Sequence, residues 1–240
     1  MRPPNSEGSE EIQNQDRYGH KKLQCEEVLA NYRQNKGGPK YISLRLPDVV
    51  GPRDNTYRWW IYQLWMTMNK YLEKEIVIPA NLREKPLSFV FVKDVANLIK
   101  NLVADFPEGA EDQAFNLAQT ETPSLMELLN AMKSELELSD IEITTSDAPE
   151  TIKLFPSVNL GTVNISKAEN ILNWSPTPLS EVVKQTVSFY ESAMGNHLFD
   201  KARRDIIHMM QTYFAKKPFN VIRALRDVYH LNYPADKDEL

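Results

Sequence analysis

The chain is poor in cysteine and in long apolar runs. Cys25 is the single cysteine among 240 residues, so an internal disulfide is excluded and a buried thiol is its expected role. No apolar run approaches the roughly 18 residues of a membrane-spanning helix, and residues 1–6 lack a signal-peptide core. We therefore expect no membrane partner, and a cytoplasmic protein as the chain is written.

Glycine is also scarce. Of the eight glycines only Gly37 and Gly38 are close neighbours, so no glycine-rich turn is present to hold a phosphate at a helix N-terminus. The four histidines have no metal-ligand spacing and there is no Ser-His-Asp order, so we expect neither a metal site nor a serine hydrolase. A net charge of −5 argues against nucleic acid as a partner, because a phosphate backbone attracts a basic face.

The composition, 42% hydrophobic and 25% charged, is that of a globular protein with one sizeable core. Residues 1–15 are polar and acidic and predict a disordered leader. Predicted strands and helices alternate over residues 16–195, which indicates an α/β fold, and residues 196–240 predict a helical extension. Strands are predicted at 40–46, 75–79, 88–92, 113–118 and 141–145, helices at 17–35, 56–73, 94–105, 124–138 and 179–193, and a Pro-rich loop before 179.

The extension ends on Lys-Asp-Glu-Leu, residues 237–240, which is an ER-retention address. A chain without a targeting signal never meets the receptor, so the address acts only if an upstream segment is missing from this sequence. In that case we expect the ER lumen. Sequons at Asn164 and Asn173 are compatible with the lumen, and they are equally compatible with ordinary caps and turns.

A tyrosine with a lysine four residues later, which share one face if the segment is helical, occurs four times. The pairs are Tyr18/Lys22, Tyr32/Lys36, Tyr213/Lys217 and Tyr233/Lys237. Glycine or proline adjoins each of the last three and marks a helix end. Only Tyr18/Lys22 stands at the start of a long helical pattern.

The helix predicted over residues 17–35 has Asp16 as a candidate N-cap and an apolar stripe that we expect to be buried. The stripe consists of Cys25, Val28, Leu29 and Tyr32. A phenol titrates near pH 10, and a cation held nearby lowers this pKa by roughly 1–3 pH units, toward proton exchange with a hydroxyl or carbonyl. A surface lysine beside an amphipathic tyrosine is the alternative, and spacing alone favours it.

Further segments follow this helix in a recognisable order. They are Tyr41–Leu46 with Gly51–Asp54, Phe89–Ala96, Ala114–Ala118 with Ser124–Leu128, and Asn164–Ala168 with Leu172–Pro176 and Leu179–Val183. With Tyr18 and Lys22 they make residues 16–194 resemble the C-terminal portion of the extended short-chain dehydrogenase/reductase family, the NAD-dependent epimerases and dehydratases. The Gly-rich cofactor-binding half of that family has no counterpart in the sequence.

The resemblance implies a partial Rossmann-like, doubly wound parallel sheet with a small α/β substrate lobe within residues 16–195. It implies NAD or NADP as the cofactor and a small-molecule substrate that reacts at a hydroxyl or carbonyl. Tyr18 would exchange the proton, Lys22 would lower its pKa and hold the nicotinamide ribose, and Pro47 would lie by the nicotinamide.

Departures from the family bear on activity and substrate. Its Gly-x-x-Gly-x-x-Gly turn and its catalytic Ser or Thr upstream of the tyrosine are absent, so a chain complete as written should bind NAD poorly and turn over very slowly or not at all. Leu87 stands where nucleotide-sugar epimerases carry an arginine for the diphosphate, with Arg83 near but out of register. Asp48 replaces a common substrate-facing asparagine, and its charge would repel a diphosphate. Asp48 and Arg83 are the candidate substrate residues.

Two functions remain possible. The chain is either a truncated and impaired enzyme of this type or a non-catalytic binding or scaffold relative with a protein or RNA partner. Its acidity weakens the RNA version. The aromatic residues of the helix predicted at 56–73 favour core packing over an aromatic wall above a substrate cleft. A parallel sheet cut before its catalytic helix exposes an edge, so we also expect self-association or a partner chain on that edge.

Overall fold

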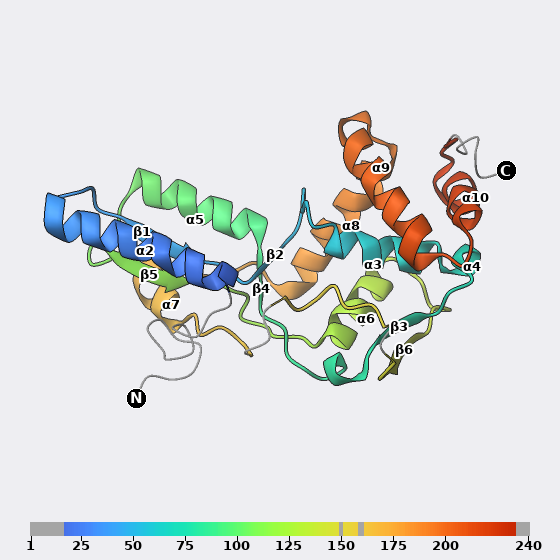
Figure 1. Cartoon of the computed structure of the whole chain (residues 1–240), viewed down its shortest axis with the longest axis horizontal. Coiled ribbons are helices and arrows are strands. Elements are labelled where there is room, and N and C mark those ends of the chain that lie inside the picture. Colours follow the sequence, from blue (N-terminus) through green and yellow to red (C-terminus); the bar gives the residue numbers. More distant parts are fainter. Residues whose placement is uncertain (1–16, 149–150, 158–160, 234–240) are drawn as a thin grey trace. The chain divides into compact units, whose positions relative to one another are not determined.

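The computed structural model describes residues 17–148, 151–157 and 161–233 of the chain (Figure 1). The expected leader 1–15, the candidate cap Asp16 and the Lys-Asp-Glu-Leu end lie outside the described residues. The helices are α2 (Arg17–Lys36), α3 (Arg58–Thr67), α4 (Asn69–Leu72), α5 (Val92–Ala104), α6 (Leu125–Glu135), α7 (Ser166–Leu172), α8 (Leu179–Gly195), α9 (Asp200–Met209) and α10 (Pro218–Tyr229), with the shorter η1 (Ala80–Leu82), η2 (His197–Phe199) and the π-helix η3 (Met210–Phe214). The strands are β1 (Ile42–Arg45), β2 (Asp48–Val50), β3 (Ile76–Pro79), β4 (Phe89–Phe91), β5 (Gln113–Asn116) and β6 (Ile143–Ser146).

Most predicted elements are confirmed. The helix predicted at 56–73 is divided into α3 and α4, β2 was not predicted, and neither was α7. A Pro-rich loop is predicted there, but Ser166–Leu172 is helical and ends at Asn173, which takes the left-handed conformation at φ 51°. The Trp174 indole N–H then donates to the Ala118 carbonyl at 2.8 Å. A tertiary contact thus stabilises a helix too short to be stable by itself. None of the helices in the described residues is long and apolar enough to cross a membrane.

The chain folds into two compact units. The first unit consists of the described residues in three segments: those up to Val49, Leu87–Thr122 and Pro156–Pro178. The second unit consists of the described residues in Val50–Pro86, in Pro123–Phe155 and from Leu179 onward. Both units are therefore assembled from segments far apart in the sequence. The expected division into 16–195 and 196–240 differs from this one, because the residues after 195 pack in one unit with α3 and α4.

In the first unit β1 and β5 pair in parallel, from Ile42 opposite Gln113 to Arg45 opposite Asn116. Figure 1 shows α2 running beside this pair. The core of the unit lies among β5, α5 and α7, and its buried members are Val90, Val95, Leu98, Ala110, Phe115, Leu117, Ala168, Leu172 and Trp174. Parallel strands covered by helices confirm the predicted α/β, Rossmann-like class, and within the described residues the sheet is partial.

In the second unit β3 and β6 form another parallel pair, and α3 is the central helix. Every residue of Trp59–Met66 is buried. Trp60 stacks on Tyr190 of α8 with 4.9 Å between ring centroids, and Trp65 meets Phe214 edge-on at 5.0 Å. The core-packing interpretation of these aromatics is confirmed. An aromatic wall over a cleft is wrong, because the indole rings have no exposed surface to offer.

The helices after Gly195 complete this second core. Figure 1 shows α10 beside α4. The backbone N–H of Lys216 donates to the Leu72 carbonyl at 2.9 Å, and the Tyr57 hydroxyl donates to the Asp205 carboxylate at 3.1 Å. The predicted helical extension is confirmed as helical, and its position explains why α3 is buried on all sides.

The apolar stripe of α2 does not face the sheet. Val28 is 65% exposed, Tyr32 is 51% exposed and the Cys25 thiol is exposed, and no residue of the helix is buried. The prediction of a buried stripe and a buried thiol is therefore wrong. The physical reason is that a neighbouring face, which carries Glu26 and Arg33, makes the hydrogen bonds to the sheet side, and these polar contacts set the rotation of the helix.

Candidate functional site

Tyr18 and Lys22 lie together in the first turns of α2. The Lys22 ammonium is over the Tyr18 ring, 5.3 Å from its centroid, as expected for residues four apart on a helix. The Tyr18 side chain is 71% exposed. The pair is thus accessible to a small molecule.

A second pair on the same helix has nearly the same local geometry. Lys36 lies over the Tyr32 ring at 5.9 Å from its centroid. Local geometry therefore does not distinguish Tyr18/Lys22 from Tyr32/Lys36. Their places relative to the sheet do. Arg33, beside Tyr32, bonds to Asp112 just before β5, and Glu26 bonds to Arg45 at the end of β1, so α2 and β1 run in opposite directions and the two pairs lie toward opposite ends of β1.

Glu26, between the two pairs, fixes the register of α2 against β1. Its carboxylate accepts hydrogen bonds from the Arg45 guanidinium at 2.8 and 2.5 Å and from the Ser43 hydroxyl at 2.8 Å. Tyr18 is eight residues before Glu26, about 12 Å nearer the helix start. Tyr18 and Lys22 therefore lie toward the carboxyl end of β1, where open α/β sheets bind their ligands.

The charge of Glu26 is stabilised by these contacts. Partial burial opposes ionisation, but the hydrogen bonds from Arg45 and Ser43 and the positive charge of Arg45 outweigh it and lower the pKa of Glu26 from its ordinary 4.5. Glu26 is thus an anion in the folded protein at neutral pH. The sequence analysis missed this residue, although a carboxylate one turn after Lys22 with an arginine on the next strand was a readable signal.

Pro47 and Asp48 follow β1 at the same end of the strand. Asp48 is 5% exposed, and both of its carboxylate oxygens accept hydrogen bonds from Ser157, one from the backbone N–H at 2.8 Å and one from the hydroxyl. These contacts favour a role for Asp48 in anchoring the 151–157 segment. Ser157 carries no motif and could not be predicted as its partner.

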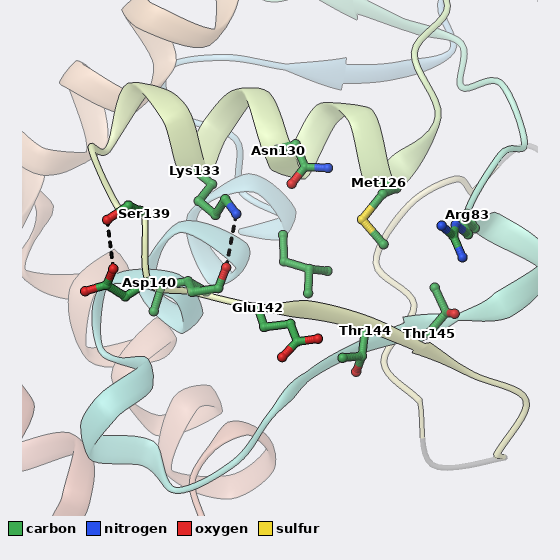
Figure 2. A pocket seen from close by; sticks show the side chains of 11 residues that line it. Arg83, Met126, Asn130, Lys133, Ser139, Asp140, Glu142, Thr144 and Thr145 are labelled. Atoms are coloured by element: carbon green, nitrogen blue, oxygen red, sulfur yellow. Dashed lines mark hydrogen bonds between the residues drawn. The ribbon is translucent and has the colours of Figure 1, made fainter.

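Arg83 belongs to the second unit, where it lines a groove of about 700 Å³ between α6 and β6 (Figure 2). Figure 2 shows Arg83 at one end near Thr145, and Lys133 toward the other end. The Lys133 ammonium donates to the Ile141 carbonyl at 3.1 Å. Glu142 adds a carboxylate to the rim, so the groove carries both signs of charge and suits a polar ligand.

The remaining candidate motifs do not form sites. The helical segment that carries Tyr213 ends at Phe214, and Ala215 is extended, so Tyr213 and Lys217 do not share a helix face. Lys237, the partner of Tyr233, lies outside the described residues. Across residues 17–148, 151–157 and 161–233 no group of three or more His, Cys, Asp or Glu side chains could hold a metal ion.

Known proteins resemble this chain in sequence and in fold. Residues 2–118 match the model of the NAD dependent epimerase/dehydratase family. This part, just under half of the chain, is similar to that family. The epimerase/dehydratase match contains Tyr18, Lys22, Pro47, Asp48 and Arg83, so every candidate site residue falls within it. No curated protein matched the chain.

Several solved structures are similar to the chain. UDP-glucose 4-epimerase from Thermotoga maritima, solved with UDP-glucose, is 22% identical at a TM-score of 0.58 over 74% of this chain and 54% of that one. dTDP-glucose 4,6-dehydratase from Bacillus anthracis, solved with NAD, is 18% identical, with a TM-score of 0.54 over 74% of this chain and 53% of that one. RMD from Pseudomonas aeruginosa, solved with NADPH, is 14% identical, with a TM-score of 0.54 over 73% of this chain and 56% of that one. The chain thus spans about half the length of these proteins, and the likeness establishes a shared fold.

Proposed function

We propose that this chain carries the proton-transfer and substrate part of an NAD(P)-dependent epimerase, dehydratase or reductase that acts on a hydroxyl or carbonyl of a small molecule. The observation that supports this most directly is the exposed Tyr18/Lys22 pair toward the carboxyl end of β1, in a segment that matches the epimerase/dehydratase family. In this proposal residues 16–195 supply the C-terminal part of a cofactor-binding domain with its substrate lobe.

The described residues fit one end of the cofactor. Lys22 offers a positive charge and hydrogen-bond donors to a ribose, and Pro47 offers an apolar contact beside a nicotinamide ring. The pyrophosphate end is different, because the sequence has no cluster of glycines whose backbone N–H groups could hold it. NAD(P), when bound, supplies or accepts a hydride.

The proton is handled by the chain itself. Tyr18 donates its hydroxyl proton to a substrate carbonyl, or accepts one from a substrate hydroxyl, and Lys22 stabilises the negative charge that develops on the phenol oxygen. Both groups are already on one face of α2, so the pair needs no rearrangement of the helix. The exposed ring of Tyr18 would have to be covered by the bound ligands for water to be excluded.

For the substrate, we propose Arg83 as the contact with a negatively charged or polar group, since the structure shows it on the surface of a groove. Asp48, the other residue that the sequence suggests, has its oxygens occupied by Ser157. We therefore propose an anchoring role for Asp48. A polar small molecule without a diphosphate fits the mixed charges of the groove best.

Nucleotide titration tests the proposal. NADH and NADPH are added to the chain and their fluorescence is followed. Weak but saturable binding is expected, because the glycine-rich turn is absent, and Lys22→Ala should weaken it roughly tenfold or more. Lys36→Ala is the matched control, because Lys36 makes the same ring contact at the other end of α2. Equal weakening by both substitutions would show that the binding signal does not come from the proposed site.

Proton transfer is tested by a second pair of variants. With a small hydroxyl compound that lacks a diphosphate, such as glucose, as a probe substrate and NAD present, Tyr18→Phe should lower any turnover by roughly 10²–10⁴-fold, while Tyr32→Phe should leave it unchanged. The scarcity of glycine favours a second candidate, a non-catalytic binding relative. That candidate predicts no saturable binding of either nucleotide, so the first titration separates the two functions.

A further inference from the structure

The helix that carries Tyr18 and Lys22 is not held by apolar packing. No residue of α2 is buried, and none belongs to the buried core cluster of the first unit or to the partly buried side chains around it, which are Ile42, Leu44, Leu102, Ile165 and Ile171. Val28 is 65% exposed and Leu29 is 44% exposed, and Leu23 and Ala30, on the face of Glu26, are only half-buried. Apolar burial therefore contributes little to keeping α2 in place.

Two polar contacts hold α2 in place. Near the middle of the helix Glu26 holds Arg45 with both carboxylate oxygens and also accepts the Ser43 hydroxyl, which joins α2 to two positions of β1. At the end of the helix Arg33 donates to Asp112 and to the Gly38 carbonyl, each at 2.9 Å. Arg33 lies nearer the C-terminal end of α2 than Glu26 does, whereas Tyr18 and Lys22 lie at the N-terminal end. The Arg33 contacts therefore restrain the end of the helix that is far from the site.

The Glu26–Arg45 contact has the features of a strong ion pair. The carboxylate and guanidinium are bound through two parallel hydrogen bonds, and their side chains are only 22% and 24% exposed. Bidentate pairs of this kind fix direction as well as distance, and partial burial limits screening by salt. A contact with one hydrogen bond would allow the helix to pivot.

We infer that Glu26 is a positioning residue for the Tyr18/Lys22 pair, and that its ion pair with Arg45 holds the pair at the carboxyl end of β1. Lys22 is one turn before Glu26 and Tyr18 is two turns before it, so any rotation or lift of α2 at Glu26 is passed along the rigid helix to both side chains. Glu26 itself contacts neither substrate nor cofactor. The inference rests on the function proposed above.

Cys25 makes the inference testable without any ligand. As the single cysteine, exposed on the outer face of α2, it takes a nitroxide spin label whose spectrum reports the mobility of the helix. Glu26→Gln removes the charge but not the shape, and the label should then show a new mobile component. Lys40→Gln is the matched control, because it breaks the Lys40–Glu111 ion pair of the same unit, 3.0 Å long, without touching α2.

Rescue separates positioning from a general loss of stability. The exchange Glu26→Arg with Arg45→Glu restores an ion pair of reversed polarity, so it should return the label toward its immobile spectrum, whereas Arg45→Glu alone should not. In the same proteins NADH affinity should fall roughly tenfold in Glu26→Gln, because only the fraction with α2 docked is competent to bind, and should recover in the exchange. Lys40→Gln should bind NADH like the original chain.

The outcomes distinguish the two proposals. A label spectrum unchanged by Glu26→Gln, or a mobile label with NADH affinity unchanged, would overturn the positioning role. If the original chain binds neither NADH nor NADPH, the proposed function fails, and the label spectrum still decides whether Glu26 fixes the helix. Far-UV circular dichroism of each variant shows whether it is folded. If Glu26→Gln does not fold, the exchange variant still tests the positioning role.

Discussion

At the scale of single residues, the Glu26 carboxylate is the group whose protonation the structure constrains most clearly near the candidate site. Its hydrogen bonds from Arg45 and Ser43 need the ionised form. Because this pKa is lowered in the folded protein, the stabilisation is complete above the ordinary 4.5 and is lost as the pH falls through the lowered value. Neutral pH is therefore the condition in which α2 is held best.

Thermal unfolding of the chain and of Glu26→Gln between pH 7 and pH 3 checks this. The two melting temperatures should differ most at neutral pH and should converge in acid, because protonation of Glu26 removes the charge that the substitution removes. A gap of the same size at pH 3 would mean that the charge of Glu26 contributes nothing to stability.

Asp48 provides a second prediction at this scale. Asp48→Ala removes the acceptor of two hydrogen bonds from Ser157, which is itself exposed to water, and should cost about 1 kcal/mol of unfolding free energy. Asp48→Asn keeps an acceptor oxygen of the same shape and should cost clearly less. Urea unfolding of the three proteins measures both values. Equal losses for Ala and Asn would assign the effect to the charge, and would weaken the anchoring role.

At the scale of elements, α6 shows how a sequence specifies a helix start. Ser124 caps the helix by accepting the Glu127 backbone N–H at 3.2 Å, and the Glu127 side chain accepts the Ser124 backbone N–H at 2.7 Å. This reciprocal capping box satisfies two backbone donors that the helix itself leaves unpaired. The helix start predicted at 124 is confirmed for that local reason.

Removing the cap should have a local, measurable cost. Ser124→Ala is expected to lower the unfolding free energy by about 1 kcal/mol, since it removes the side-chain half of the box. Ser139→Ala is the control, because Ser139 is exposed and its hydroxyl bonds only to neighbouring Asp140. Chemical denaturation measures both. A control that is as destabilised as Ser124→Ala would show that serine removal as such, and not the cap, is responsible.

The sequence predicted the burial of α3 correctly but not the burial of α2. For α2 the spacing correctly predicted a helix and the shared face of Tyr18 and Lys22, but it assigned the wrong face to the interior. For α3 the aromatic content correctly favoured a core position. Periodicity identifies two faces of a helix, but which one is covered depends on what packs there, and for α2 the ion pair at Glu26 decided it.

At the scale of the whole molecule, the second unit depends on the helices after Gly195. Trp65 is 1% exposed and packs edge-on against Phe214 of the π-helix η3. Trp65→Ala should therefore cost about 3–5 kcal/mol, through lost burial and the cavity left behind. Phe219→Ala, at a residue 50% exposed, is the control and should stay near neutral. A small loss at Trp65, measured by calorimetry, would contradict the assignment of η3 to this core.

Association is the other prediction for the whole molecule. Among the described residues β1 pairs only with β5, and apolar side chains of α2 are exposed. We expect the isolated chain to self-associate, or to bind a chain that covers an edge of this strand pair. Sedimentation over a range of concentrations should show mass increasing with concentration, and Val28→Lys should reduce it. A monomer at all concentrations that melts cooperatively would contradict this.

The sequence by itself determined most of the elements, the α/β class and the resemblance to the epimerase/dehydratase family. Hydrophobic spacing, turn residues and caps act over a few neighbours, so they can be read without knowing the fold, and the ordered motifs from Tyr18 to Leu179 agree with the epimerase/dehydratase match. The spacing of Tyr18 and Lys22 is of the same local kind, but the identical spacing of Tyr32 and Lys36 shows that it could not select a site.

Only the tertiary structure decided which of these local features matter. It placed one tyrosine–lysine pair at the carboxyl end of β1, turned the apolar stripe of α2 outward, engaged Asp48 with Ser157 and packed the last helices into the core of α3. Each of these depends on partners tens of residues away, such as Arg45 for Glu26 or Phe214 for Trp65. Contacts of that range follow from how segments assemble, and a pattern within one segment contains no information about them.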